Sequence, residues 1–114
     1  MVILSVAGLG YQILAVRNVR ALIESGWCQN QMAVDADDVE VPYNSPRACK
    51  WCLLGAIYQV SATMGLNLME FQRLFHRRTL HFDLAKYNDT HTHEEVLALL
   101  DNVIDVLEAE KWKS

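Results

Sequence analysis

Cysteines and histidines are the residue types in this chain that could carry out chemistry. Two of the three cysteines directly follow a tryptophan, in the pairs Trp27-Cys28 and Trp51-Cys52. A thiol beside an indole in an apolar setting either packs as a small hydrophobic group or is held ready as a nucleophile. These two pairs therefore mark the first region to consider for a site.

A cysteine nucleophile needs a neighbouring base and an acid or amide that orients the base. His91 or His93 could act as the base, and Asn88 or Asp89 could orient it. The alternative is that Asn88 and Asp89 turn the chain ahead of the last helix, a role that suits both residue types. The sequence favours the turn. Thiol catalysis by Cys28 or by the second Trp-linked cysteine remains the enzyme alternative.

Cys49-Lys50-Trp51-Cys52 is a Cys-x-x-Cys sequence, whose spacing allows two thiols to share a disulfide or a metal ion. Zinc would require Cys28, Cys49, Cys52 and a histidine, for which the chain offers His76, His81, His91 and His93. A second closely spaced ligand pair is missing, and no βαβ pattern of the thioredoxin type precedes the motif. We therefore predict no metal ion and no cofactor, and free thiols that pack as hydrophobic groups.

A basic cluster is the remaining candidate site. It consists of Arg73, His76, Arg77, Arg78 and His81. Guanidinium groups could bind a phosphate or a carboxylate, although a run of charges is more often a solvated helix face. The cluster, especially its three arginines, is kept as a candidate ligand or partner surface.

Charge and composition limit the partners. The net charge is −4, and residues 87–114 carry seven acidic side chains against two basic ones. This balance argues against nucleic acid, which needs clustered Lys or Arg. The apolar stretch 1–10 lacks the basic start of a signal peptide and is too short to span a bilayer. We expect no membrane insertion, a cytoplasmic location in a bacterium or a phage-infected host cell, and reduced cysteines.

Hydrophobic periodicity predicts an all-α fold, a single domain over residues 1–114 with 1–10 as an apolar extension. Four main helices are expected: 11–25, a central buried helix at 46–64, a shorter one from Asn67 to about Arg78, and a last one from Thr92. The start of the central helix is placed at Ser45-Pro46, an N-cap followed by proline. Residues 30–42 should form a loop or a small β-hairpin, and 79–91 a long connection.

Four ordered motifs resemble an uncharacterised small domain family of bacteria and phages. They are Gly26-Trp27-Cys28-Gln29, Lys50-Trp51-Cys52-Leu53-Leu54-Gly55-Ala56, Tyr87-Asn88-Asp89 and Thr92-His93-Glu94-Glu95-Val96-Leu97. The resemblance covers about 13–107 and implies no known activity. It implies that Trp27, Cys28, Trp51, Cys52, Gly55, Asn88 and Asp89 form one neighbourhood, so Trp27, Trp51, Asn88 and Asp89 join the arginines as candidate partner-binding residues. The family pattern does not include a cysteine at position 49, and the stretch 67–83 is longer than usual in this chain.

These observations lead to one main functional expectation. The chain is acidic, lacks a complete catalytic signature and has a lone basic cluster, which favours a non-catalytic binding protein. Such a protein could act as a homodimer or as a small phage-type inhibitor of a larger protein.

Overall fold

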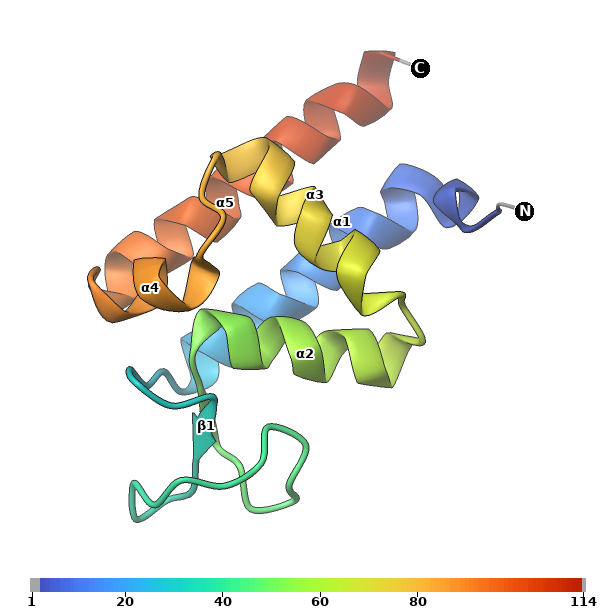
Figure 1. Ribbon diagram of the computed structural model, residues 1–114. Coiled ribbons are helices and arrows are strands. Elements are labelled where there is room, and N and C mark those ends of the chain that lie inside the picture. The colour runs from blue at the N-terminus through green and yellow to red at the C-terminus, as the bar shows by residue number, and fades with distance from the viewer. Residues whose placement is uncertain (1–2, 114) are drawn as a thin grey trace.

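The computed structural model describes residues 3–113 and is built mainly from helices around one core (Figure 1). Its elements, in chain order, are α1 (Ile3–Ser25), β1 (Ala33–Val34), β2 (Lys50–Trp51), α2 (Leu53–Met64), α3 (Leu68–Thr79), α4 (Leu84–Asp89) and α5 (His93–Lys113). The predicted all-α class with a small β element is confirmed. A fifth, short helix, α4, lies within the segment that we expected to be an irregular connection.

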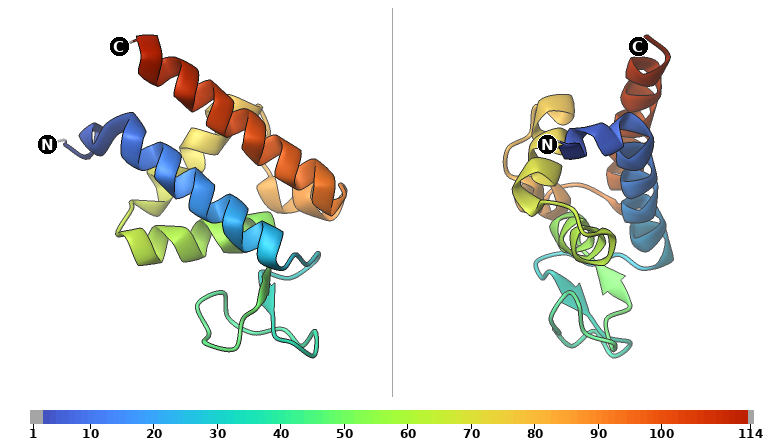
Figure 2. Two further views of the ribbon diagram at one scale, coloured as in Figure 1. Left: turned by 180° about the vertical axis from the view of Figure 1, so that it is seen from behind. Right: turned by 90° about the vertical axis from the view of Figure 1, so that its right-hand side faces the viewer.

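The helices α1 and α5 form an antiparallel pair on one side of the molecule, and α2, α3 and α4 cover the inner face of this pair (Figure 2). The apolar positions of both helices recur at helical spacing, so each helix has one apolar face. Packing these faces together removes them from water and stabilises the fold. The fully buried side chains of the pair are Val16, Val19, Ile23, Val96, Leu100, Val103 and Leu107.

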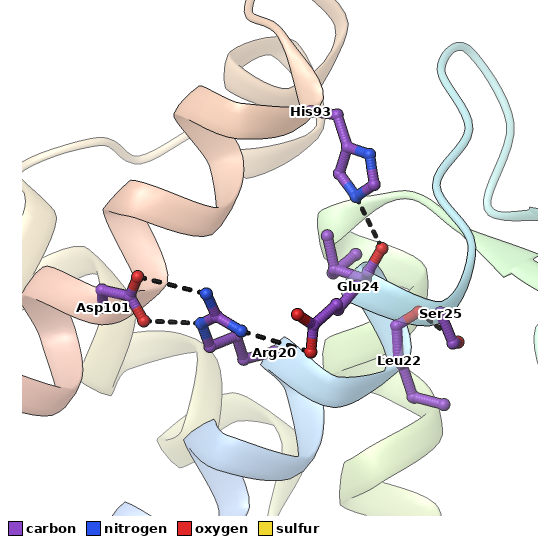
Figure 3. A network of polar contacts seen from close by, with 7 residues as sticks. Arg20, Leu22, Glu24, Ser25, His93 and Asp101 are labelled. Atoms are coloured by element: carbon purple, nitrogen blue, oxygen red, sulfur yellow. Dashed lines mark hydrogen bonds and ion pairs between the residues drawn. The ribbon is translucent and has the colours of Figure 1, made fainter.

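Polar contacts fix the register of α1 against α5 (Figure 3). Arg20 donates from Nε and Nη2 to the two carboxylate oxygens of Asp101, and it also pairs with Glu24. His93 Nε2 lies 2.7 Å from the backbone oxygen of Ile23. Because a carbonyl oxygen only accepts, Nε2 is the donor in this hydrogen bond. The start of α5 is thereby attached to the end of α1.

The predicted start of the central helix was wrong, although the helix itself is present and buried. α2 begins at Leu53 with Cys52 as its N-cap, seven residues after Pro46. Ser45 and Pro46 form a turn in which Ser45 Oγ accepts from the backbone N–H of Arg47. The chain then remains extended because β2 pairs with β1. Sheet hydrogen bonds thus outweigh a favourable local helix start.

Residues 30–42, for which a loop or a small β-hairpin was predicted, form a small hairpin. A third segment, β2, pairs with it. Val34 and Glu40 form an antiparallel bridge around the turn, and the backbone N–H of Val41 donates to the oxygen of Ala33. β1 also pairs with β2, so the 30–42 segment is held against the residues that lead into α2. A parallel bridge between Trp27 and Trp51 brings the two Trp-Cys pairs side by side.

Asp35 closes the tip of this hairpin. Its Oδ1 accepts from the backbone N–H groups of Asp37 at 2.8 Å and Val39 at 3.0 Å. Arg47 adds an ion pair at 3.4 Å. These contacts favour the ionised form and lower the pKa of Asp35, with the N–H of Val39 as the largest cause.

The replacement Asp35→Asn should therefore destabilise the protein in a pH-dependent way. A carboxylate with a lowered folded pKa stabilises the protein above its unfolded pKa, and this stabilisation is lost as pH falls through the folded pKa. We expect urea unfolding at pH 7 to show a lower free energy for the variant. The difference should shrink once the pH falls below the ordinary carboxyl pKa of 3.8. An equal difference at pH 7 and at low pH would contradict this role of the charge.

α1 begins eight residues earlier than the predicted position 11, and it bends at Gly8, whose φ is 57°. Of the predicted extension 1–10, residues 1 and 2 lie outside the described residues. Tyr11 then attaches α1 to the end of α2, because its hydroxyl donates to the oxygen of Met64 at 2.7 Å. No helix within residues 3–113 carries an apolar stretch long enough to cross a membrane.

Residues close in the sequence cap α2, α3 and α5. Asn67 Oδ1 accepts from the backbone N–H of Glu70 at the start of α3. Thr92 and Glu95 form a complete capping box, in which each side chain accepts from the backbone N–H of the other residue. Gly65 ends α2 in the left-handed conformation, with a φ of 67°.

Candidate functional site

Asn88 is the centre of the region that the motifs share. It is fully buried at the end of α4, and its side chain makes four hydrogen bonds. Oδ1 accepts from Trp27 Nε1 at 2.7 Å and from the backbone N–H of Leu53 at 3.0 Å. Nδ2 donates to the oxygen of Cys28 at 3.0 Å and to Asp89 Oδ1 at 3.1 Å. We call Asn88 and these four partners the Asn88 cluster.

The cluster joins three separate parts of the chain. Trp27 and Cys28 follow α1, Leu53 begins α2, and Asn88 and Asp89 end α4. The two donors and two acceptors around Asn88 match the two acceptor sites and two donor protons of an amide. Its hydrogen-bonding capacity is therefore satisfied within the protein.

The neighbouring Gln29 and Asp89 reinforce these contacts. Gln29 Nε2 donates to the backbone oxygens of Asn88 at 3.2 Å and His91 at 3.0 Å. Asp89 Oδ1 accepts from the backbone N–H of Asn30, which lies in the left-handed region with a φ of 69°. The glutamine of the Gly-Trp-Cys-Gln motif and the Asn-Asp pair thus clamp the 27–30 loop onto α4.

Both candidate catalytic histidines are engaged elsewhere. The ring of His93 stacks on Trp27, with 5.2 Å between the ring centroids, and its Nε2 donates to the end of α1. The ring of His91 stacks on Tyr87 at 3.7 Å, and its Nδ1 lies 2.7 Å from the oxygen of Tyr87. Neither imidazole hydrogen-bonds a cysteine within the described part of the chain. The structure does not assemble the thiol and base pair that catalysis would require.

The two Trp-linked thiols are held in their neutral form. Burial is the largest cause that raises the pKa of Cys28, to about 12, and the neighbouring Cys52 and Asp89 add to the rise. Burial also raises the pKa of Cys52, against the opposing hydrogen bond from the backbone N–H of Gly55 at 3.3 Å. Because the thiolate is the nucleophile, raised pKa values reduce the reactivity of both cysteines at neutral pH.

Gly55 shows how closely the elements approach one another in this region. A Cβ at this position would collide with the backbone oxygen of Met32. That oxygen is itself fixed, because it accepts from the backbone N–H of Cys52 at 3.1 Å. The close neighbour of this glycine is the backbone directly ahead of β1 rather than another helix.

The proposed metal ligands do not form a site. Cys49 is exposed, whereas Cys52 is buried as the α2 N-cap and Cys28 is half-buried. Within residues 3–113, no three His, Cys, Asp or Glu side chains are arranged to hold a metal ion. Trp51, a candidate partner-binding residue, donates from Nε1 to the backbone oxygen of Tyr43 at 3.0 Å.

Four residues of the basic cluster lie on α3 and His81 follows this helix, and the three arginines line a cleft. Arg78 is mostly buried and pairs with Glu110 of α5 at 2.7 Å. Arg73 and Arg77 are exposed, and their guanidinium groups make no hydrogen bond or ion pair within residues 3–113. His76 and His81 instead contact the rings of Phe82 and Tyr87.

The cleft has a volume of about 550 Å³ and lies between α1 and α3. The first half of α1 contributes Gly8, Tyr11 and Gln12, and α3 contributes the three arginines on its other side. The sequence indicated the arginines as a candidate surface, but it did not indicate that Gly8, Tyr11 and Gln12 form the opposite wall of a cleft. That wall is positioned by tertiary contacts of α1, such as the hydrogen bond of Tyr11 to the end of α2, and local patterns do not show such contacts.

Comparison with known protein families gives a match over most of the chain. The model of DUF6197, described as a family of unknown function, matches residues 15–106. This range contains both Trp-Cys pairs and the complete Asn88 cluster. No curated protein and no solved structure matches the chain. The chain therefore belongs to DUF6197.

Proposed function

We propose that this chain is a non-catalytic binding protein that acts through a protein partner. The observation that carries the proposal is the state of the Asn88 cluster, in which the polar atoms of the motif residues are used in internal hydrogen bonds. Residues that bind substrate or transfer protons need free polar atoms directed at a ligand. Here, Trp27, Asn88 and Asp89 stabilise the fold and leave function to other surfaces.

The partner is either a larger protein or a second copy of the chain, and we place the binding in the cytoplasm of a bacterium or phage-infected host cell. Three cysteines without a disulfide suit a reducing compartment. The acidic net charge of −4 supports a protein partner over nucleic acid. A small inhibitor of a larger host or phage protein is the form of this role that we favour.

Light scattering combined with partner capture tests the binding role. The expected result is either a dimer in solution or a captured protein that, once purified, binds the chain saturably and at fixed stoichiometry in calorimetry. A strict monomer for which no captured protein binds saturably after purification would contradict the proposal.

Thiol labelling separates binding from cysteine catalysis. Cys49 is exposed, whereas burial raises the pKa of Cys28 and Cys52. We therefore expect iodoacetamide at pH 7.5 to modify Cys49 first and the other two cysteines much more slowly, as followed by mass spectrometry of peptides. Cys49→Ser is the control, because it should remove the fast phase. Rapid labelling of Cys28 or Cys52 that slows in His91→Ala or His93→Ala would instead support the enzyme alternative.

A further inference from the structure

We propose that the cleft between α1 and α3 binds an acidic amphipathic helix of the partner protein, with the apolar side chains of that helix on the cleft floor and its carboxylates at Arg73 and Arg77. The proposal rests on the binding function proposed above and specifies its surface and the chemistry of its partner. Three features of the cleft carry it: its charge, its floor and its size.

The cleft is lined by two arginines that make no ion pair within the described part of the chain. The chain has six arginines, and four of them are paired with carboxylates: Arg17 with Glu108, Arg20 with Asp101, Arg47 with Asp35 and Arg78 with Glu110. Arg73 and Arg77 are the two arginines without a carboxylate partner within residues 3–113, and both line this cleft. They are four residues apart on α3 and so lie on the same helix face. Two adjacent unpaired guanidinium groups favour a partner with carboxylates.

Arg78 lines the same cleft but is already engaged within the protein. Its Nη2 donates to Glu110 and its Nη1 donates to the backbone oxygen of Leu74. The carboxylates of a partner are therefore expected at Arg73 and Arg77 rather than at Arg78.

The floor of the cleft is apolar. Phe71 and Leu74 are among the buried core residues that line it, and Leu66 lies at its end. Tyr11 contributes a half-buried ring whose hydroxyl is already bonded to Met64. A surface with an apolar floor and a charged rim is typical of grooves that hold amphipathic helices. A volume of about 550 Å³ accommodates a few side chains rather than a whole domain.

Two observations favour an acidic helix over a phosphate-bearing ligand. Glu70 lines the same cleft in the first turn of α3 and would repel a phosphate near that helix end. A nucleic acid would also bring a negative charge at every nucleotide to a chain with a net charge of −4, whereas a helix carries only a few carboxylates. An amphipathic helix can place its carboxylates at Arg73 and Arg77 only, and apolar side chains elsewhere.

Fluorescence anisotropy with a designed peptide tests this assignment. The probe is a fluorescein-labelled, hydrocarbon-stapled peptide of about four helical turns, with leucines at i, i+3, i+4 and i+7 and glutamates at exposed positions. We expect saturable binding to the full chain that weakens as salt is added. The same peptide with lysines in place of glutamates should bind at least about tenfold more weakly.

Charge-reversal variants locate the site. Arg77→Glu should weaken binding of the acidic peptide by about tenfold, and Arg73→Glu with Arg77→Glu should abolish it. Lys86→Glu is the matched control, because it makes the same charge change at an exposed position of α4 that lies outside the cleft. This variant should leave the affinity for the acidic peptide within about twofold. Equal weakening by Lys86→Glu would overturn the assignment, since it would indicate only a general charge effect.

Other outcomes also decide the proposal. Tighter binding of a 15-nucleotide single-stranded DNA than of the acidic peptide would overturn it in favour of a phosphate ligand. A natural partner that binds the Arg73→Glu and Arg77→Glu double variant at full affinity would overturn the cleft assignment while leaving the binding function in place. Loss of that natural partner in the double variant, with retention in Lys86→Glu, would support both.

Discussion

Asn88→Ala should destabilise the protein more than any other single truncation of a polar side chain. The variant leaves the buried backbone N–H of Leu53 without a partner, and with it the part-buried Trp27 Nε1 and the backbone oxygen of Cys28. Each unsatisfied buried group costs on the order of 1–3 kcal/mol. We expect a loss of about 4 kcal/mol in the free energy of unfolding, measured by urea denaturation.

Two companion variants isolate the hydrogen bonds from other effects. Asn102→Ala replaces an exposed asparagine on α5 and should change stability by less than about 0.5 kcal/mol. Asn88→Asp keeps the acceptor but removes the Nδ2 donor to Cys28, and it places a charge beside Asp89. It should also be strongly destabilising at pH 7. A loss below about 1 kcal/mol for Asn88→Ala would mean that the cluster contributes little to stability.

Gly55→Ala gives the second large expected effect, and its sign is opposite to that of most glycine replacements in helices. Alanine normally favours a helix over glycine by about 1 kcal/mol. At position 55, however, the new Cβ would collide with the backbone oxygen of Met32, which cannot move without breaking its hydrogen bond to Cys52. We expect destabilisation of about 2–3 kcal/mol in thermal or urea unfolding.

The chain contains a matched control for this prediction. Gly10 also lies within a helix, and a Cβ built there has no neighbour within 4 Å. Gly10→Ala should therefore raise stability by up to about 1 kcal/mol, as helix propensity alone predicts. If both variants were stabilising, the close approach of α2 to the strand region would be disproved.

Local sequence patterns identified most helices because their signals are contained within the helices. The Thr92 and Glu95 capping box, the Asn67 cap and the Gly65 stop are all decided by residues within a few positions of one another. The start of α2 was missed for the opposite reason. Pairing of Lys50–Trp51 with Ala33–Val34 is a tertiary interaction, and it overrides the helix start at Ser45-Pro46.

The same distinction applies to the site. The motifs predicted one neighbourhood of Trp27, Cys28, Trp51, Cys52, Gly55, Asn88 and Asp89, and in the structure hydrogen bonds join Asn88 to Trp27, Cys28 and Asp89. They did not indicate how the polar atoms are used, because an asparagine before a helix is equally suited to a cap or to a ligand. The arginines of α3 were visible in the sequence. Their unpaired state depends on where the acidic side chains of α5 come to lie, and this is decided by the packing of α5 against α1 and α3.

The Asn88 cluster also bears on folding kinetics. Its hydrogen bonds connect residues that are 35, 60 and 61 positions apart. Closing such long segments of chain carries a loop entropy cost, so helix pairs can associate before these contacts form. Interactions that form after the transition state mainly slow unfolding and have little effect on folding speed. We therefore expect Asn88→Ala to speed unfolding more than it slows folding, so that the cluster mainly prolongs the lifetime of the native state.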